Sequence, residues 1–306
     1  MIVYSDPVMS ADRVRDELFN GNLVLRSDIN AVSELVQHTR AWLATLFSPY
    51  DPESAHEHFS PAEAAGILGK GKPAFIHDRR SNQLVEEIIQ EAGFDPERMY
   101  YDLPKPRTSF PLGHLSTGVA FAFPWHRDVW YSAPRQQINW WLPVFAVTPQ
   151  NAMSFDPDKF DASVENDSHL FDYYVNNAGR HSTAKQLDRE VQARPGAREH
   201  RADHEMTIIP APGSVLLFSG AQLHTSIPNT SGRSRYSVDF RTVDAADLAG
   251  RRGAPLVDAH CTGTAIRDFR RVKDGAGFDE QLVVDIFGAP PDGAELVFAP
   301  DGSTKA

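Results

Sequence analysis

The sequence predicts a mainly β fold with helices, in which helical segments come first and a core of short strands follows. Over residues 1–106, apolar side chains recur at the three- and four-residue spacing of amphipathic helices. From about residue 107 the chain changes to short apolar or alternating runs separated by proline, glycine, asparagine and serine, which is typical of an all-β core. A long polar segment, residues 156–203, interrupts these runs and predicts an insert between two strands.

Three segments of the first part have the pattern of amphipathic helices. In SADRVRDELFNG, Ser10 is suited to cap the helix N-terminus and Gly21 to end the helix. Residues 31–47 repeat the pattern, and residues 81–94 form the third such segment. We therefore expect three helices before the β core.

Short apolar runs predict the strands of the second part. The candidates are STGVAFAF (116–123), QQINWWLPVFAV (136–147), HEMTIIPA (204–211), GSVLLFSG (213–220) and RYSVDFRTV (235–243). The insert is expected to contain a helix. In the tail, residues 264–272 and 279–288 have the pattern of short helices.

Composition and charge exclude several classes of protein. The 306 residues are 41% hydrophobic, which is enough for a sizeable core. A net charge of −11 provides no global basic field for nucleic acid or anionic lipid. No apolar stretch approaches the ~20 residues of a membrane helix, and charges stand where a signal peptide needs its apolar region. Cys261 is the only cysteine, so an internal disulfide is excluded. We expect a soluble cytoplasmic protein; the oligomeric state stays open.

The run AFPWHRDVW contains a histidine and an aspartate two residues apart among aromatic residues. On a strand, His126 and Asp128 would project from one face while Arg127 points away. His224, just after an apolar run, is the candidate third ligand from a neighbouring strand. Two imidazoles and one carboxylate are the ligand set of non-haem Fe(II) oxygenases. A His-x-Asp pair is common by chance, so the sequence that follows His224 decides the interpretation.

Eleven residues after His224, Arg235 opens the run RYSVDFRTV. A guanidinium buried on a barrel strand requires an anion, because an unpaired charge there is unfavourable. A dicarboxylate co-substrate would supply that anion, because a planar guanidinium can donate two parallel hydrogen bonds to a carboxylate. Ser226, two residues beyond the histidine, is placed to donate a further hydrogen bond. The pattern favours a site that binds both a metal and a dicarboxylate.

These motifs resemble the Fe(II)/2-oxoglutarate-dependent oxygenases, and within them the phytanoyl-CoA dioxygenase-like group. WHRD looks like the first metal motif of that group, and WLPVFAVTPQNAMSF resembles its tryptophan-containing strand and turn. GSVLLFSGAQLHTSIPNTSGRSR is similar to its signature of Gly, His, Asn-x-Ser and Arg. Ala152 departs from the glycine that usually follows Asn151 in the turn. The resemblance covers roughly residues 107–243.

The resemblance implies a double-stranded β-helix core (jelly roll, cupin-like) within a single oxygenase domain. The helical N-terminal region would be 1–106, the core 107–245 with its insert 156–203, and the C-terminal extension 246–306. The resemblance also implies three Fe(II) ligands, namely His126, Asp128 and His224. It places three residues around the distal carboxylate of 2-oxoglutarate, namely Arg235, Ser226 and Trp141. Gln137 and Asn139 share the strand face of Trp141, so either is expected to reach the co-substrate as well.

The implied reaction uses Fe(II), 2-oxoglutarate and O2 to oxidise, by default to hydroxylate, an unactivated C–H bond of a small-molecule metabolite. Succinate and CO2 would be released. Asp128 argues against a halogenase, because halogenases of this class replace the carboxylate with Gly or Ala. Two alternatives stay open: a cupin-type metal enzyme (an isomerase or a dioxygenase) that does not use 2-oxoglutarate, and a non-catalytic jelly-roll binding module. The acidic composition favours a neutral or cationic substrate over an acyl-CoA.

Several other residues have two interpretations. His56 and His58 are expected to be surface histidines of a polar loop rather than a second metal pair. Asp239 and Arg241 share the strand face of Arg235, and either shape the inner site or form an ion pair at the strand end. Trp130 and Tyr131 are either pocket walls or core aromatics. The insert is expected to act as a lid.

Overall fold

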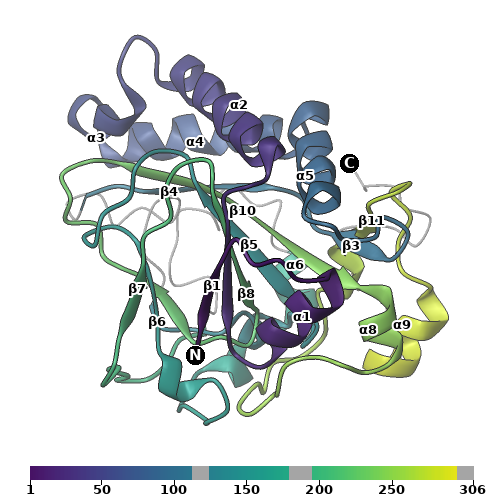
Figure 1. The fold of residues 1–306 in the computed structure, drawn as a ribbon. Helices are drawn as coiled ribbons and strands as arrows, with labels where there is room; N and C mark the ends of the chain where they lie inside the picture. Colours follow the sequence, from purple (N-terminus) through teal and green to yellow (C-terminus); the bar gives the residue numbers. More distant parts are fainter. Residues whose placement is uncertain (112–123, 179–194, 295–306) are drawn as a thin grey trace.

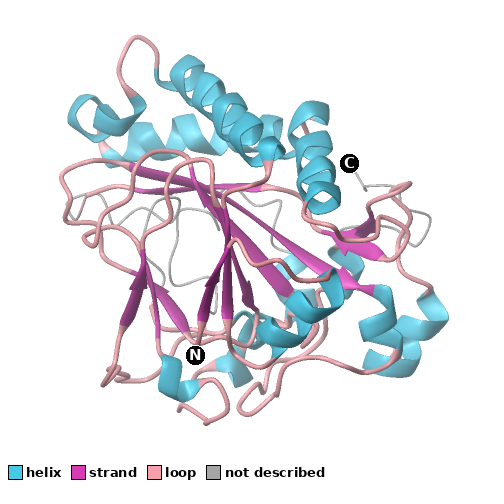
Figure 2. Cartoon of the chain, in the orientation of Figure 1, coloured by secondary structure: helices cyan, strands magenta, loops and turns pink. Residues whose placement is uncertain are grey.

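A computed structural model describes residues 1–111, 124–178 and 195–294 of the chain (Figure 1). Its elements form a β core of two sheets with helices packed on the outside (Figure 2). This arrangement confirms the predicted fold class, a jelly-roll core with helices. Helices hold more of the chain than strands do, about 35% against 20%.

The N-terminal region supplies five helices. They are α1 (Ala11–Phe19), α2 (Asn30–Phe47), α3 (Ala55–His58), α4 (Pro61–Ile76) and α5 (Arg79–Glu91). The three predicted helices are confirmed as α1, α2 and α5, and the side chain of Ser10 caps α1 by accepting from the Arg13 N–H.

Helix α4 was not predicted, and its composition explains why. It begins with a capping box in which Ser60 and Glu63 each accept from the other's backbone N–H. Its interior, however, contains Gly66, Gly69, Gly71 and Pro73, which are the residues with the lowest helix propensity. Packing against α2 and α5 stabilises the helix in spite of this composition (Figure 1).

The strands form a larger mixed sheet and a smaller antiparallel one. The larger sheet has the order β1-β2-β8-β5-β10-β3-β11, with β4 also paired to β10, and the smaller sheet has the order β7-β6-β9. The bounds are β1 (Val3–Ser5), β2 (Leu23–Arg26), β3 (Met99–Tyr101), β4 (Lys105–Ser109), β5 (Ile138–Pro143), β6 (Met153–Phe155), β7 (Met206–Ile208), β8 (Val215–Ser219), β9 (His224–Ser226), β10 (Arg235–Asp244) and β11 (Arg270–Arg271). Four of the five predicted strand runs contain β5, β7, β8 and β10, while 116–123 lies outside the described residues.

The N-terminal region is not purely helical, because it also contributes strands to the larger sheet. β1 and β2 extend the sheet beyond β8, β3 pairs with β10, and β4, which begins at the end of this region, pairs with β10 along its whole length. These strands have three to five residues, which is too short for an alternation pattern to be distinguished from chance.

The insert and the tail are made of short elements. The insert contains η4 (Pro157–Lys159), η5 (Ser168–Leu170) and α6 (Tyr173–Ala178), and the predicted helix within it is confirmed as α6. The tail contains α8 (Ala245–Ala249), η6 (Ile266–Asp268) and α9 (Glu280–Phe287). The helix predicted at 279–288 is confirmed, whereas 264–272 forms η6 followed by β11. No described helix combines the length and the apolar composition needed to cross a membrane.

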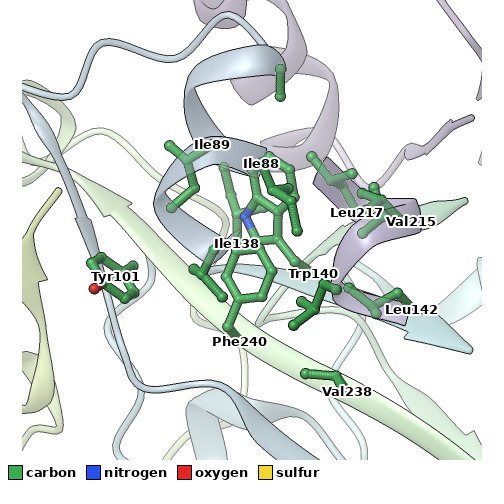
Figure 3. Packing of buried hydrophobic residues seen from close by; sticks show 14 of the residues in the cluster. Ile88, Ile89, Tyr101, Ile138, Trp140, Leu142, Val215, Leu217, Val238 and Phe240 are labelled. Carbon is green, nitrogen blue, oxygen red and sulfur yellow. The ribbon is translucent and has the colours of Figure 1, made fainter. Parts of the chain in front are cut away.

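The main hydrophobic core lies between the larger sheet and the N-terminal helices. Trp140 of β5 and Phe240 of β10 stack with ring centroids 5.3 Å apart, and Ile88 and Ile89 of α5 pack over them (Figure 3). Since side chains alternate across a strand, the neighbouring residues of β5 and β10 point to the other face, into the space between the two sheets. That space contains the candidate site.

Candidate metal centre

A turn, and not a strand, positions the first two candidate ligands. His126 forms one isolated antiparallel bridge with His224, through backbone hydrogen bonds of 2.9 and 3.0 Å. Asp128 then begins the 3₁₀ helix η3 (Asp128–Tyr131). The predicted strand alternation at this segment is therefore wrong. The turn still directs His126 and Asp128 to the same place.

His224, the first residue of β9, completes a group of three. One ligand atom from each of His126, Asp128 and His224 lies within 4.8 Å of the others. Asp128 Oδ1 is 3.6 Å from Nε2 of His126 and 4.0 Å from Nε2 of His224. Within the described residues this is the only group of three such side chains close enough to share an ion.

Both imidazoles are held in the orientation that metal binding requires. Nδ1 of His126 donates to the Pro124 carbonyl at 2.8 Å, and Nδ1 of His224 donates to the Gln222 carbonyl at 2.9 Å. Each ring therefore presents the lone pair of Nε2 to the site. Burial, together with the neighbouring His126, lowers the pKa of His224 to about 3, so this imidazole stays neutral and able to bind a metal.

Two amides hold the far oxygen of Asp128. Gln137 Nε2 and Asn139 Nδ2 donate to Asp128 Oδ2 at 3.0 and 2.9 Å. Burial opposes ionisation of Asp128, but its hydrogen bond with His126 and the charge of Arg241 hold its pKa well below the usual range. Gln137 and Asn139 also line the cavity. Their hydrogen bonds to the candidate ligand Asp128 were not predicted from the sequence.

Arg127 points away from the site, as predicted, into a buried ionic centre. Its guanidinium is 1% exposed and donates to Asp258 Oδ2 at 3.2 Å. It also donates to four backbone carbonyls, of Lys159, Phe160, Ala162 and Ala221. Asp258 accepts in addition from the indole of Trp130 at 2.7 Å, so Trp130 belongs to the core. Arg127 thus connects the ligand turn to the insert, to the turn between β8 and β9 and to the tail.

The three candidate ligands open into a cavity of about 640 Å³. Side chains of the insert and the tail form one wall: Phe171, Tyr173, Asn176, Ala265, Asp268 and Phe269. Tyr131 also lines the cavity, which decides between the two interpretations of that residue. The cavity is also lined by Trp141, by Arg235 and by residues of α4 and of β4, the strand that pairs with the start of β10.

Arg235 is buried at the start of β10 with its donors directed into this cavity. Its Nε and Nη1 have no hydrogen-bond partner among the described residues, and burial lowers its pKa to about 10. The guanidinium lies 5.8 Å from the ring centroid of Trp141. An unsatisfied buried cation of this kind requires an anionic partner.

Two serines line the same cavity as Arg235. Ser226, predicted from the sequence, lines the cavity from β9. Ser237 was not predicted: it lines the cavity two residues after Arg235, is 1% exposed, and its hydroxyl has no partner among the described residues. The strand parity of RYSVDFRTV was the signal that could have found it.

Asp239 and Arg241 form a network of ion pairs on the same face of β10. Asp239 accepts from Arg107 Nε at 2.6 Å and lies 3.2 Å from Arg241 Nη2. Arg241 also pairs with Asp102 at 3.1 Å, and Lys105 pairs with Asp102. Both interpretations of this pair hold, because the residues form ion pairs and also line the cavity.

The pair His56 and His58 lies away from the site, in α3 and not in the expected loop. Nδ1 of His56 lies 2.9 Å from the Ser234 hydroxyl, so His56 is a packed residue and not a surface one. The His58 ring stacks on Tyr50.

Comparison with known proteins gives one family and several similar structures. The sequence profile described as phytanoyl-CoA dioxygenase (PhyH) matches residues 20–237, well over half of the chain. This match extends beyond the strand motifs to α2, α4 and α5. No curated protein sequence matches at a significant level.

The similar solved structures share little sequence with the chain. EvdO2 from Micromonospora carbonacea var. aurantiaca, complexed with 2-oxoglutarate, is 13% identical, with a TM-score of 0.46 over 78% of this chain and 92% of that one. A non-heme monooxygenase, the ThoJ nickel complex, is 12% identical, with 0.43 over 90% and 95%. SnoK, a non-heme alpha ketoglutarate dependent carbocyclase from nogalamycin biosynthesis, is 14% identical, with 0.40 over 81% and 94%. At these scores the family profile is the finding that carries weight.

Proposed function

The chain belongs to the phytanoyl-CoA dioxygenase family, and from this premise we propose that His126, Asp128 and His224 bind its iron. The enzyme is a non-haem oxygenase that depends on Fe(II) and 2-oxoglutarate. The donor set fits the metal, because two Nε2 atoms and one carboxylate oxygen converge while both Nδ1 atoms are already hydrogen-bonded. Three ligands on one side leave positions open for co-substrate and O2.

Each neighbouring side chain has a role in preparing this centre. The bound iron and 2-oxoglutarate supply the oxidising chemistry, in which O2 is consumed, succinate and CO2 are released and a substrate C–H bond is oxidised. Gln137 and Asn139 hold Asp128 Oδ2, so that only Oδ1 faces the imidazoles and the aspartate occupies a single position. We propose hydroxylation as the outcome, for a small-molecule substrate.

Arg235 is the observation that carries the use of 2-oxoglutarate. Two of its donors have no partner among the described residues, its guanidinium lies beside Trp141, and Ser226 and Ser237 line the same cavity. We propose that these four residues bind the distal carboxylate of 2-oxoglutarate. A cupin-type enzyme that does not use 2-oxoglutarate, or a non-catalytic module, would have no dicarboxylate to pair with this buried cation.

Anaerobic titration with Fe(II) and 2-oxoglutarate tests the proposal. A weak visible metal-to-ligand charge-transfer band should appear only when both are present, since it requires them at one centre. His224→Ala should abolish the band together with iron binding. Arg235→Ala should retain iron and form the band only at higher 2-oxoglutarate concentration. Iron binding with no band at saturating 2-oxoglutarate would favour the cupin-type alternative.

Three features stay proposals from the sequence. We propose that the chain is one oxygenase domain, that it acts in the cytoplasm, and that the insert 156–203 closes over the substrate. The described part of the insert supports the last point, because Phe171 and Tyr173 line the cavity.

A further inference from the structure

Arg241 of β10 lies beside the candidate metal centre. Its Nε is 3.9 Å from Asp128 Oδ2, and the side chain lines the cavity. Within the described residues, Arg241 is the only lysine or arginine that forms an ion pair with one of the three candidate ligands. The register of the larger sheet explains its place, because Arg241 is directly opposite Asn139, which donates to the same Asp128 oxygen. Two paired strands therefore set the position of this guanidinium.

Two carboxylates fix the orientation of the Arg241 guanidinium. Nη1 donates to Asp102 Oδ2 at 3.1 Å, and Nη2 lies 3.2 Å from Asp239 Oδ2. The backbone N–H of Arg241 also donates to Asp102, at 2.7 Å. Burial opposes the charge of Arg241, but Asp239, Asp102 and Asp128 raise its pKa above the usual range, so the side chain is a cation. With both Nη atoms paired, Nε is the nitrogen that lies nearest to Asp128.

Asp128 does not use this Nε–H as a hydrogen-bond donor. Its Oδ2 already accepts from Gln137 and Asn139, at 3.0 and 2.9 Å, and a carboxylate oxygen has about two lone pairs. The 3.9 Å between Oδ2 and Arg241 Nε is an ion-pair distance and is too long for a hydrogen bond. Arg241 Nε donates to no other described residue. A charged donor beside the metal ligand is therefore left for a molecule that binds there.

We propose that Arg241 binds the 2-oxo acid end of the co-substrate, whose carboxylate lies at the metal, while Arg235 binds the other carboxylate. The inference rests on the proposed function and assigns a further binding residue to that same site. A carboxylate bound beside Asp128 gives the Nε–H of Arg241 an acceptor, and a charge-assisted hydrogen bond is stronger than a neutral one. Arg235 and Arg241 share one face of β10 and both line the cavity, so each serves one end of a dicarboxylate.

A purely structural role is the alternative for Arg241. Through Asp102, Arg241 joins the chain that follows β3 to β10. If this were its only role, its loss would disturb the strand beside Asp128 and weaken iron binding. A binding role predicts a different result for the metal, because removal of a positive charge beside a cation should not reduce the affinity for that cation. The affinity for iron therefore separates the two roles.

Two 2-oxo acids of equal chain length test the proposal: 2-oxoglutarate, and 2-oxovalerate, which lacks the distal carboxylate. Each is titrated anaerobically into protein loaded with Fe(II), and its binding is followed by the metal-to-ligand charge-transfer band. Arg241→Met should weaken the binding of both acids about tenfold or more and should not lower the affinity for iron. Arg235→Met should weaken the binding of 2-oxoglutarate only, because 2-oxovalerate has no distal carboxylate.

Two further variants complete the experiment. Arg107→Met is the matched control, since Arg107 is another partner of Asp239 on the same cavity. This variant should bind both acids as the parent protein does. Arg241→Lys keeps the charge but lacks the Nε–H, so it should weaken the binding of 2-oxovalerate several-fold. It replaces Arg241→Met in the experiment if that variant does not fold.

The outcomes distinguish this proposal from the proposed function. Four results would overturn the role of Arg241 alone: an unchanged affinity for 2-oxovalerate in the folded Arg241 variants, an equal loss in Arg107→Met, a loss of iron affinity in the Arg241 variants, or no binding of 2-oxovalerate to the parent protein. Failure of both Arg241 variants to fold would assign the residue to the structure and overturn it as well. Absence of the band with 2-oxoglutarate in the parent protein would overturn the proposed function instead.

Discussion

The two faces of β5 and β10 carry opposite chemistry although they share one backbone. On one face Trp140 and Phe240 stack in the core beneath α5 (Figure 3). On the other, Asn139, Asp239 and Arg241 line the cavity. Adjacent residues of one strand therefore serve different purposes. A substitution on the core face should change stability, and a substitution on the cavity face should change the binding of iron or co-substrate.

The largest effect is expected at the cavity face, from loss of a metal ligand. His224→Ala should abolish Fe(II)-dependent turnover, because it removes a metal ligand. Its unfolding midpoint should stay close to that of the metal-free parent protein. His126→Ala and Asp128→Ala should behave in the same way. Iron content, turnover and thermal unfolding check this. Full activity with stoichiometric iron in His224→Ala would show that the ligand assignment is wrong.

The core face should respond in the opposite manner. Phe240→Ala removes a ring that is fully buried and stacked on Trp140, and should lower the free energy of unfolding by about 3–5 kcal/mol. The folded fraction should bind iron and 2-oxoglutarate as the parent protein does. Denaturant unfolding with parallel titrations measures both quantities. A loss of iron affinity without a loss of stability would break the separation of the two faces.

Arg235, the first residue of β10, tests the cavity face through the binding of 2-oxoglutarate. Truncating a bidentate, partly desolvated charge contact costs about 2–5 kcal/mol, so Arg235→Ala should weaken 2-oxoglutarate binding at least about tenfold. Iron affinity should not change. Arg235→Lys should recover part of the loss, since an ammonium keeps the charge and lacks the fork.

The control for this prediction is Arg233, which has the same parity but lies outside the cavity, paired with Glu53 at 2.9 Å. Arg233→Ala should have little effect on 2-oxoglutarate affinity. If Arg235→Ala leaves that affinity unchanged, then Arg233 or Arg241 holds the carboxylate, or the co-substrate binds elsewhere.

The smallest effect is expected for the amides behind the metal. Asn139→Leu removes one donor to Asp128 Oδ2 and should weaken iron binding about 10- to 100-fold, the usual effect of losing a group that orients a ligand. Ile138→Val, on the opposite face one residue earlier, should lower stability by about 0.5–1.5 kcal/mol and leave iron affinity unchanged. Metal titration and unfolding of both variants complete the comparison. Equal iron affinity in Asn139→Leu and in the parent protein would assign the amides to the co-substrate alone.

The sequence predicted which residues meet at the cavity better than it predicted the secondary structure around them. The pair His126 and Asp128 and the pair His224 and Arg235 are each close in the sequence, and the resemblance to a family related the two pairs to one site. The parity of 137, 139 and 141 was also readable, because side chains alternate on any strand. The structure places these residues around one cavity.

The features that the sequence did not predict depend on contacts between distant segments. His126 looks like part of a strand, but its partner is His224, and the turn at Asp128 forms where η3 begins. Helix α4 contains glycine and proline, and packing stabilises it.

The ionic centre at Arg127 sets the limits of the smallest piece of this protein that can be dissected out or transplanted. Asp258 lies 131 residues from Arg127 and after the end of β10. A chain cut after β10 would retain every proposed ligand and co-substrate residue, yet it would leave the Arg127 guanidinium buried without its carboxylate, a defect of about 3–5 kcal/mol. Arg127 stands between two of the proposed ligands in the sequence, so the metal motif cannot be transferred to another protein without Asp258. The smallest functional piece must therefore include part of the tail.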